Sequence, residues 1–248
     1  DSVFRGASIV VHLAAVTAAD LEPATEAEVE SRNYECARLV AEACTRAGCR
    51  LLVPSTTSVY GAVHGDVDES SPIVDLPANH RYVETKFRIE QMLRQQARGG
   101  LRYAVLRFGT IYGTSPGARF DTAVNKFCWQ AARGESLTVW RTALDQTRPY
   151  LALDDAVRAL RFVMQEDLFG AELFNVVSQN ATVRDVVAGI RGVMGGAAVE
   201  LVESPIMTTT SFSVSAARLQ RLGCRVDGDL GEGIRRVIES LKALHVHA

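Results

Sequence analysis

Apolar residues along the chain follow two spacings. Short continuous apolar runs lie near residues 8–13, 50–54 and 103–107, and each has the length and composition of a strand buried on both faces. Longer stretches near residues 24–48 and 80–97 carry apolar residues at every third or fourth position, as on an amphipathic helix. The order strand, helix, strand, helix, strand predicts an α/β fold with a doubly wound parallel sheet and right-handed crossovers.

The pattern changes after residue 108. Residues 109–117 are rich in turn-forming residues, among them Gly and Pro. Beyond them the pattern predicts helices near 119–133, 182–195, 214–222 and 230–243, and strands near 137–140, 148–153, 173–177 and 198–202. We therefore predict two units, residues 1–108 and a smaller α/β lobe over residues 109–248. Segments near 149–177 are expected to pack back on the sheet of the first unit.

Composition and charge narrow the class of protein. With 248 residues, of which 47% are hydrophobic, the chain can bury a large core in one or two domains. Its formal net charge of −2 gives no reason to expect a nucleic acid or an acidic membrane as partner. Its longest apolar runs fall far short of the roughly 18 residues that a membrane helix needs.

Cysteine and histidine spacing argues against a metal site. The five cysteines are odd in number, and no CxxC, HxxH or HExxH occurs in the sequence. A disulfide framework is therefore not expected, and a reducing compartment is the default. We expect no metal and a cytoplasmic location.

One stretch of the chain concentrates reactive side chains. Residues 55–58 read STTS and follow a predicted strand, whereas Tyr82 and Lys86 lie four positions apart on a predicted helix and so share one face. In an open α/β sheet, ligands bind at the carboxyl ends of the strands. A hydroxyl, a phenol and an ammonium that converge there form a set able to transfer protons.

The small residues after the first strand and Asn33 on the first helix each allow two interpretations. Ala14 and Ala15 either let a ligand approach the first strand closely or simply allow close packing of helix on strand. Asn33 either faces solvent from the first helix or hydrogen-bonds the neighbouring loops. His12 is expected to be a core histidine and not a catalyst.

Three further features are expected to be structural. Tyr60 and Tyr112 each precede a glycine at the end of an apolar segment, and core packing is their expected role. The acidic residues Asp66, Asp68 and Glu69 are expected to form a solvated surface loop.

Several motifs in one order resemble a known family. VHLAA, LLVPSTTSVYG, YVETK, LRFGTIYG, TRPYLALDDAVRAL and FNVVS resemble the extended short-chain dehydrogenases, specifically the NAD-dependent epimerase/dehydratase family that acts on nucleotide sugars. YxxxK alone is a weak signal, but here it follows Thr56 by 26 residues and precedes R-F-x-x-x-Y-G. The resemblance implies a Rossmann-type, partial NAD-binding domain over residues 1–108 and a lobe that binds the nucleotide sugar over residues 109–248.

The resemblance implies a role for each member of the reactive set. Tyr82 would take the proton of a sugar hydroxyl, and since a phenol has a pKa near 10, a nearby positive charge must lower it. Lys86 would supply that charge and also hydrogen-bond the nicotinamide ribose. The family's Ser or Thr that aligns the substrate lies five residues before Gly61, which selects Thr56. The other hydroxyls of residues 55–58 are expected to form the turn or support it.

The same resemblance assigns binding residues. The expected NAD-binding residues are Leu13, Ala14, Ala15, Asn33, Tyr82, Lys86 and Phe108. The expected substrate-binding residues are Thr57, Thr110, Lys126, Arg141 and Arg148. Arg148 resembles an arginine that grips the substrate diphosphate, a task suited to a bidentate guanidinium, and an ordinary ion pair is the alternative. Lys126 and Arg141 stand in for a second family arginine that has no counterpart between Gly195 and Arg218.

Departures from the family pattern narrow the reaction. The related 4,6-dehydratases follow the catalytic Thr with an Asp-Glu pair that eliminates water, but Thr57 and Ser58 occupy those positions here. Thr110 replaces an Asn that often contacts substrate. The family's Gly-rich phosphate-binding turn does not occur in the sequence, so we expect this chain to lack the N-terminal segment that carries it.

The resemblance and these departures together imply an NAD-dependent epimerase of a nucleotide sugar that works through a keto intermediate. An NAD(P)-dependent reductase or dehydrogenase on the same scaffold is the first alternative, and NADP remains open as cofactor. For the chain as given, a catalytically incompetent fragment is the second alternative. A homodimer that pairs the helices near residues 28–47 and 80–97 is also expected.

Overall fold

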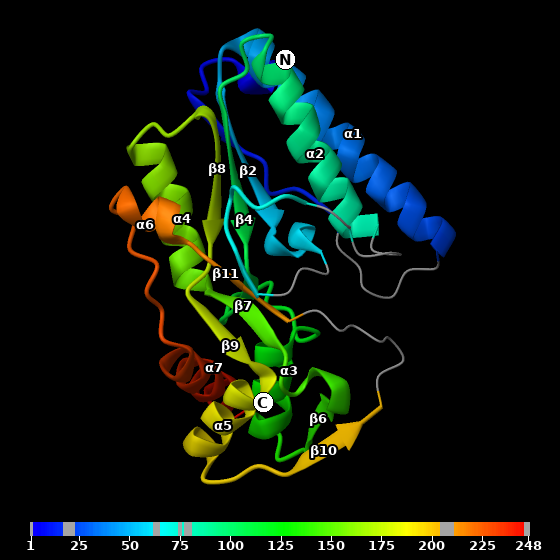
Figure 1. Ribbon diagram of the computed structural model, residues 1–248, viewed down its shortest axis with the longest axis vertical. Coiled ribbons are helices and arrows are strands. Elements are labelled where there is room, and N and C mark those ends of the chain that lie inside the picture. The colour runs from blue at the N-terminus through cyan, green and yellow to red at the C-terminus, as the bar shows by residue number, and fades with distance from the viewer. Residues whose placement is uncertain are drawn as a thin grey trace. The chain divides into compact units, whose positions relative to one another are not determined.

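The structure is a computed structural model that describes residues 2–16, 23–61, 65–73, 76, 81–203 and 211–245 (Figure 1). It divides into two compact units. Unit 1 comprises Asp1–Gly61, Glu69–Phe108 and Ala159–Asn175, and unit 2 comprises Ala62–Asp68, Gly109–Arg158 and Val176–Ala248. None of the described helices is long and apolar enough to cross a lipid bilayer.

A sheet with strand order β1-β2-β4-β8 forms the centre of unit 1. Its strands are β1 (Ile9–Val11), β2 (Arg50–Thr56), β4 (Tyr103–Phe108) and β8 (Gly170–Val176). β1, β2 and β4 run parallel, and Leu51 pairs with Val10 on one side and with Tyr103 on the other. The predicted Rossmann-type α/β fold with a parallel sheet is thus confirmed.

Two helices cover this sheet and pack against each other. Figure 1 shows α1 (Pro23–Ala47) and α2 (Arg81–Ala97) side by side against β2 and β4. The buried stripe of α1 consists of small residues, Ala37, Ala41 and Cys44, which allow close approach to the sheet. Because helix and strands alternate in a parallel sheet, both helices begin at the edge where the strands end.

Unit 2 combines short sheets with three helices around a second core. β5 (Thr110–Tyr112) pairs in parallel with β7 (Thr147–Ala152), and β7 pairs in antiparallel fashion with β9 (Gln179–Thr182). β6 (Leu137–Trp140) pairs with β10 (Val199–Val202). The core lies between α3 (Ala123–Ala132), α5 (Val183–Met194) and α7 (Leu230–His245), and the remaining helices of the unit are α4 (Leu153–Gln165), which continues into unit 1, and α6 (Ala217–Arg221).

Local hydrogen bonds define the ends of α5. Thr182 and Asp185 form a capping box, in which each side chain accepts a hydrogen bond from the other residue's backbone N–H. Gly195 ends the helix with φ 70°, a left-handed conformation that glycine adopts without steric cost.

Four short strands were not predicted from the sequence. Two of them, β3 (Gly65–Val67) and β11 (Phe212–Val214), pair in parallel although they lie far apart in the chain. β5 and β9 are three and four residues long, too short for a periodic pattern to register. The predicted solvated acidic loop is wrong for Glu69, whose carboxylate accepts a hydrogen bond from the Asn175 backbone at 2.7 Å.

Candidate active site

The predicted phenol and ammonium lie in the first turns of α2. The Lys86 ammonium donates a hydrogen bond to the Pro54 carbonyl oxygen of β2 at 3.1 Å. Its Nζ atom lies 5.7 Å from the centre of the Tyr82 ring. Both side chains are half-buried. The lysine therefore ties the start of α2 to the end of β2 and holds a positive charge beside the phenol.

Thr56 is the last residue of β2 and begins the turn that follows. Its Oγ1 accepts a hydrogen bond from the Ser58 backbone at 3.1 Å and so caps the short 3-10 helix Thr57–Tyr60. Gly61 ends this helix with φ 69°. The cap uses a lone pair of Thr56, which leaves the hydroxyl hydrogen for another acceptor. α2 packs against the 3-10 helix, so Thr56 and the first turns of α2 belong to one edge of the sheet.

The neighbouring hydroxyls are engaged inside the protein. Ser55 Oγ donates to the Glu90 carboxylate at 2.6 Å, and Thr57 Oγ1 donates to the Phe108 carbonyl at 3.2 Å. Both side chains are buried. The predicted contact of Thr57 with substrate stays a prediction, as does the contact of Phe108, which is half-buried at the end of β4, with the cofactor.

A buried ion pair supports this edge of the sheet. Arg107 of β4 makes a bidentate contact with Glu90 of α2, with Nη2–Oε2 at 2.6 Å and Nε–Oε1 at 3.0 Å. The guanidinium also lies over the Tyr60 ring at 4.9 Å, and the Tyr60 hydroxyl donates to Asn175 at 2.8 Å. Sequence reasoning missed this network. Its signal was the position of Glu90, one helical turn after Lys86 on the same face.

The loop after β1 is fixed by a side chain of α1. Asn33 accepts a hydrogen bond from the Val16 backbone N–H and donates one to the Val16 carbonyl, both at 2.9 Å. Of the two predicted readings of Asn33, hydrogen bonding to a loop is therefore confirmed. Leu13 and Val16 in this loop are 65% and 56% exposed, so an apolar surface lies at the end of β1.

Burial shapes the charges at this edge. Burial lowers the pKa of Lys86 below its usual value, and the charges of Glu30 and Glu90 oppose that shift. Burial, followed by the charge of Lys86, lowers the pKa of His12 and so favours its neutral form. A neutral His12 adds no positive charge beside Lys86.

The other predicted substrate-binding residues lie on four different elements of unit 2. Thr110 begins β5, Lys126 belongs to α3, Arg141 begins the 3-10 helix Arg141–Ala143, and Arg148 belongs to β7. Arg141 is exposed and pairs with Glu203 at 3.1 Å. Arg148 is half-buried and donates to the Gln146 side chain at 2.6 Å, and burial lowers its pKa.

A sequence comparison identifies the family. The model of the NAD dependent epimerase/dehydratase family matches residues 1–176. The chain belongs to this family. Among the described residues of this epimerase/dehydratase chain, no group of three or more His, Cys, Asp or Glu side chains is arranged to hold a metal ion.

A relative with a known name supports the family assignment. UDP-glucuronic acid decarboxylase 6 from Arabidopsis thaliana is 31% identical over 129 residues, which make up 50% of this chain and 37% of that protein. The chain thus spans little more than a third of the length of this curated relative.

Solved structures of the family share the fold. MoeE5 in complex with UDP-glucose and NAD is 27% identical with a TM-score of 0.83, and the alignment covers 100% of this chain and 82% of that one. UDP-glucuronic acid 4-epimerase from Bacillus cereus in complex with NAD is 21% identical with a TM-score of 0.83, over 98% of this chain and 77% of that one. The second likeness concerns the fold alone.

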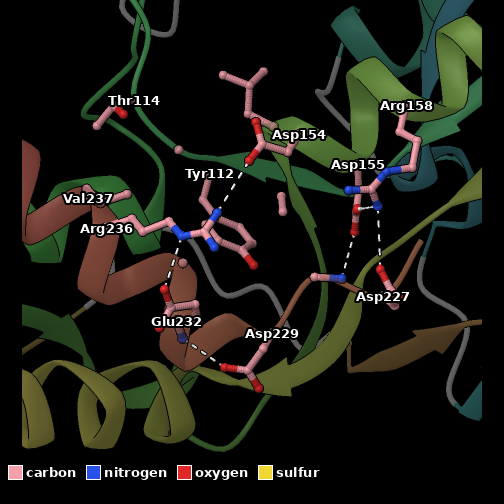
Figure 2. A pocket seen from close by; sticks show the side chains of 15 residues that line it. Tyr112, Thr114, Asp154, Asp155, Arg158, Asp227, Asp229, Glu232, Arg236 and Val237 are labelled. Carbon is pink, nitrogen blue, oxygen red and sulfur yellow. Dashed lines mark hydrogen bonds and ion pairs between the residues drawn. The ribbon is translucent and has the colours of Figure 1, made fainter. Parts of the chain in front are cut away.

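Unit 2 of this epimerase/dehydratase chain also contains a pocket that is lined by none of the predicted site residues. The pocket has a volume of about 320 Å³ and includes Tyr112, Asp154 and Arg236 in its lining (Figure 2). Arg236 reaches from α7 to Asp154 at 3.6 Å and to Glu232 at 3.1 Å. Tyr112 is buried, as predicted for a core residue, and burial together with nearby carboxylates raises the pKa of its phenol.

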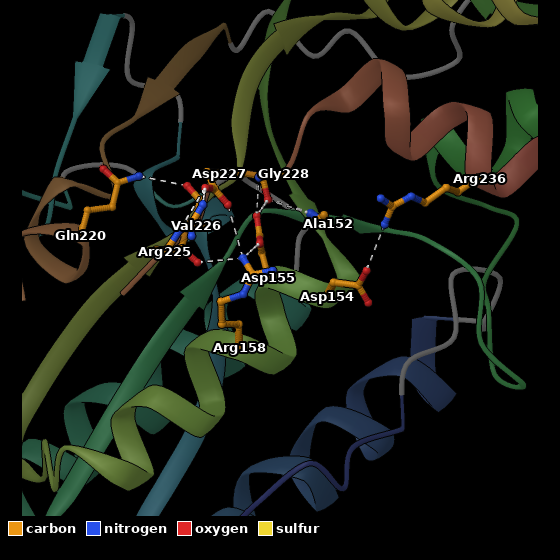
Figure 3. A network of polar contacts seen from close by, with 11 residues as sticks. Ala152, Asp154, Asp155, Arg158, Gln220, Arg225, Val226, Asp227, Gly228 and Arg236 are labelled. Carbon is orange, nitrogen blue, oxygen red and sulfur yellow. Dashed lines mark hydrogen bonds and ion pairs between the residues drawn. The ribbon is translucent and has the colours of Figure 1, made fainter. Parts of the chain in front are cut away.

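A polar network beside this pocket has a structural role. Asp155 accepts hydrogen bonds from Ser178 at 2.6 Å and from the Gly228 backbone at 2.8 Å, and it also pairs with Arg158 (Figure 3). Arg158 in turn donates to the Arg225 carbonyl at 2.9 Å. The carboxylate thus joins the start of α4 to the segment before α7, and its acceptor capacity is used within the protein.

Proposed function

We propose that the whole protein is an NAD-dependent epimerase of a nucleotide sugar. The observation that carries this proposal is the set at the end of β2 and the start of α2. A threonine with a hydroxyl hydrogen to donate, a tyrosine and a lysine anchored to the Pro54 carbonyl lie at one edge of the sheet. Such a set can remove a proton from a sugar hydroxyl and return it.

The edge of unit 1 fits NAD in its chemistry. The exposed apolar side chains of Leu13 and Val16 offer a surface that a flat ring could cover. Asn33 holds the backbone of this loop in place, and the Lys86 ammonium lies at the same edge. The proposed NAD-binding residues are Leu13, Ala14, Ala15, Asn33, Tyr82, Lys86 and Phe108. When bound, NAD would accept a hydride from a sugar carbon and give it back.

Each residue of the set has a distinct task in this proposal. Thr56 donates its hydroxyl hydrogen to the substrate oxygen and aligns it with Tyr82. The ionised phenol of Tyr82 takes the hydroxyl proton as the carbon is oxidised to a ketone, and the ammonium of Lys86 stabilises the phenolate beforehand. After the keto sugar turns over, Tyr82 returns the proton to the oxygen when the carbon is reduced on its other face. No NAD is consumed.

The residues proposed to bind the substrate differ in whether they must first give up a contact within the protein. The guanidinium of Arg148 is half-buried, and because burial disfavours its charge, a diphosphate would restore favourable electrostatics. Arg141 must first leave Glu203, an exposed pair of low strength. Lys126, Thr110 and Thr57 complete the proposed set.

A second candidate follows from the name of the Arabidopsis thaliana relative, UDP-glucuronic acid decarboxylase 6. Oxidation of a sugar acid at the carbon beta to its carboxyl group gives a β-keto acid, which loses CO₂ readily. The same Thr, Tyr and Lys would serve that first oxidation. The two candidates therefore share a first step and differ in the product.

Product analysis with the full-length protein tests the proposal. UDP-glucose and UDP-glucuronic acid are supplied in turn, products are separated by chromatography, and NADH absorbance and CO₂ are followed. We expect one sugar to equilibrate with an epimer without net change in NADH. Release of CO₂ would select the decarboxylase, and steady NADH or NADPH turnover with a carbonyl substrate would select a reductase.

We further propose that the protein is cytoplasmic and forms a homodimer through the helices near residues 28–47 and 80–97. Leu39 on α1 is 50% exposed, as an apolar residue at a subunit contact would be before assembly.

A further inference from the structure

Two successive turns of α2 contact two successive residues at the end of β2. The Lys86 ammonium donates a hydrogen bond to the Pro54 carbonyl oxygen at 3.1 Å. One turn later, the Glu90 carboxylate accepts a hydrogen bond from Ser55 Oγ at 2.6 Å. Thr56 follows directly as the last residue of β2. The mechanism proposed above uses the lysine and the threonine, but it gives no role to the contact between Ser55 and Glu90.

This contact lies on the face of the sheet that α1 and α2 cover. Side chains alternate between the two faces of a strand, so Leu51, Val53 and Ser55 share one face of β2. Leu51 and Val53 belong to the apolar core beneath the two helices, and Ser55 continues their row as a buried polar residue. The side chain of Thr56 belongs to the other face. A bond that fixes the rotation of the strand end at Ser55 therefore also fixes the direction of Thr56.

The neighbouring strand contributes a second partner for the same carboxylate. Arg107 of β4 lies opposite Ser55 of β2 in the register of the sheet. Glu90 Oε1 accepts hydrogen bonds from both, at 2.6 Å from Ser55 Oγ and at 3.0 Å from Arg107 Nε. Its Oε2 atom accepts another from Arg107 Nη2 at 2.6 Å. All three side chains are buried, so one carboxylate of α2 is bound to two strand ends at once.

Stability alone does not require a polar contact at this place. Apolar residues of similar volume are often as stabilising as a buried ion pair, because it is costly to take two charges out of water. A hydrogen-bonded carboxylate differs from an apolar contact in one respect. If α2 slid along β2, Glu90 and Ser55 would be buried without each other, which is unfavourable. The contact therefore favours one alignment of the helix with the strand.

We infer that Ser55 is a positioning residue, which through Glu90 fixes the place of Thr56 relative to the first turns of α2. Alignment matters here because a misplacement of about 1 Å between reacting groups can cost about 100-fold in rate. Tyr82 and Lys86 share one helix, so their own spacing does not depend on Ser55. The inference rests on the proposed function for the tasks of Thr56 and Tyr82, and it assigns Ser55 no contact with substrate or cofactor.

Kinetics of the full-length protein test the inference through the separate effects on kcat and KM. Ser55→Ala removes the hydroxyl and leaves the Arg107–Glu90 pair in place. We expect kcat for epimerisation to fall by about 10- to 100-fold, while KM for the nucleotide sugar and the affinity for NAD stay near their wild-type values. Ser58→Ala is the matched control, because it removes an exposed hydroxyl from the same turn and keeps the backbone N–H that caps onto Thr56. It should keep the wild-type kcat.

Hydrogen exchange supplies a readout that does not depend on turnover. In Ser55→Ala, the backbone amides of residues 56–61 should exchange faster than in wild type, because the strand end and its turn lose a bond to α2. The amides of α5 in unit 2 should exchange as in wild type. Ser55→Cys, which has nearly the same volume and only a weak donor, replaces Ser55→Ala in both experiments if the alanine variant folds poorly.

The outcomes separate the inference from the proposed function. A wild-type kcat in Ser55→Ala overturns the inference even if the free energy of unfolding falls, because the bond would then have only a structural role. An equal loss of kcat in Ser58→Ala, or unchanged exchange of residues 56–61 in Ser55→Ala, also overturns it. Faster exchange of residues 56–61 in a protein that turns over no nucleotide sugar supports the fixing of Thr56 and contradicts the proposed function instead.

Discussion

Tyr82 is the residue on which the proposed chemistry depends most. Tyr82→Phe removes one oxygen and keeps the ring beside Lys86. We expect kcat for epimerisation to fall by about 10²- to 10⁴-fold, the usual contribution of a general base, while the affinity for NAD falls far less, because the aromatic ring proposed to contact NAD is kept. Steady-state kinetics and calorimetry measure the two effects.

Tyr34→Phe is the matched control for this variant. Tyr34 lies on α1 under the Arg88 guanidinium and outside the reactive set. Its loss of a hydroxyl should leave kcat near the wild-type value. If Tyr82→Phe retained wild-type kcat as well, another group would have to act as the base.

The buried Lys86 ammonium should lower the free energy of unfolding of the protein, and this effect should depend on pH. Since burial lowers its pKa, the folded protein binds this proton less tightly than the unfolded chain, in which the pKa is about 10.4. As pH rises through the window below that value, the folded state gains stability relative to the unfolded state. The stability of wild type relative to Lys86→Met should therefore increase with pH, as urea unfolding at several pH values would show. A difference that is constant or decreases with pH would contradict the assignment.

At the residue scale, the sequence predicted the reactive set because each member depends on local spacing. Tyr82 and Lys86 need only one helix, and Thr56 needs only a strand end. The burial of Glu30, which is 8% exposed, could not be predicted in the same way, because it stands in an acidic segment together with Glu26 and Glu28 that is typical of an exposed helix start. Only the packing of α1 shows which of these carboxylates is buried.

At the scale of elements, the Arg107–Glu90 pair connects β4 to α2. Arg107→Met would leave Glu90 buried beside Ser55 without its counter-charge. We expect a loss of about 3–5 kcal/mol in the free energy of unfolding, the usual cost of breaking a buried pair from one side. Urea denaturation measures it.

An exposed arginine provides the comparison. Arg38 on α1 pairs with Glu35 and Glu42 at the surface, so Arg38→Met should cost less than about 1 kcal/mol. Equal losses for the two variants would mean that the buried pair does not connect the helix to the sheet as described. The double variant Glu90→Leu with Arg107→Met should recover part of the loss, because it leaves no unpaired buried charge.

The loop after β1 should depend on Asn33. Asn33→Ala removes both hydrogen bonds to Val16, which frees the loop that is proposed to line NAD. We expect NAD affinity to fall by about tenfold, equivalent to roughly 1.4 kcal/mol, by calorimetry with the full-length protein. Thr45→Ala, which removes a hydrogen bond to the Ala41 carbonyl on the same helix, should leave the affinity unchanged. Equal NAD affinities for wild type and Asn33→Ala would contradict the role of Asn33 in holding the NAD-binding loop.

Helices and strands with a clear hydrophobic periodicity were predictable from the sequence. Strands that exist because they pair with a distant segment were not. α1, α2, β2 and β4 follow from periodicity and length alone. β3 and β11 exist because they pair with each other, and neither segment shows a strand pattern by itself. The predicted solvent exposure of Glu69 is wrong for the same reason. Its carboxylate accepts a hydrogen bond from the backbone amide of Asn175, which is distant in the chain.

At the scale of the whole molecule, the proposed homodimer makes a separate prediction. Leu39 is half-exposed on α1 within the proposed interface. Leu39→Glu would place a charge there, and we expect light scattering to give the mass of a dimer for wild type and a lower mass for the variant. Leu201→Glu, at an exposed apolar position of unit 2, is the control and should stay dimeric. A monomeric mass for the wild-type protein would contradict the proposed homodimer.

In the proposed reaction, a hydride leaves the sugar and returns to the same carbon. The most direct measurement uses a nucleotide sugar with deuterium on the carbon whose configuration changes, incubated with the full-length protein and followed by NMR and NADH absorbance. We predict that both epimers form, that the deuterium stays on that carbon and that NADH does not accumulate. Loss of the deuterium, net formation of NADH or a product that has lost CO₂ or water would contradict the account.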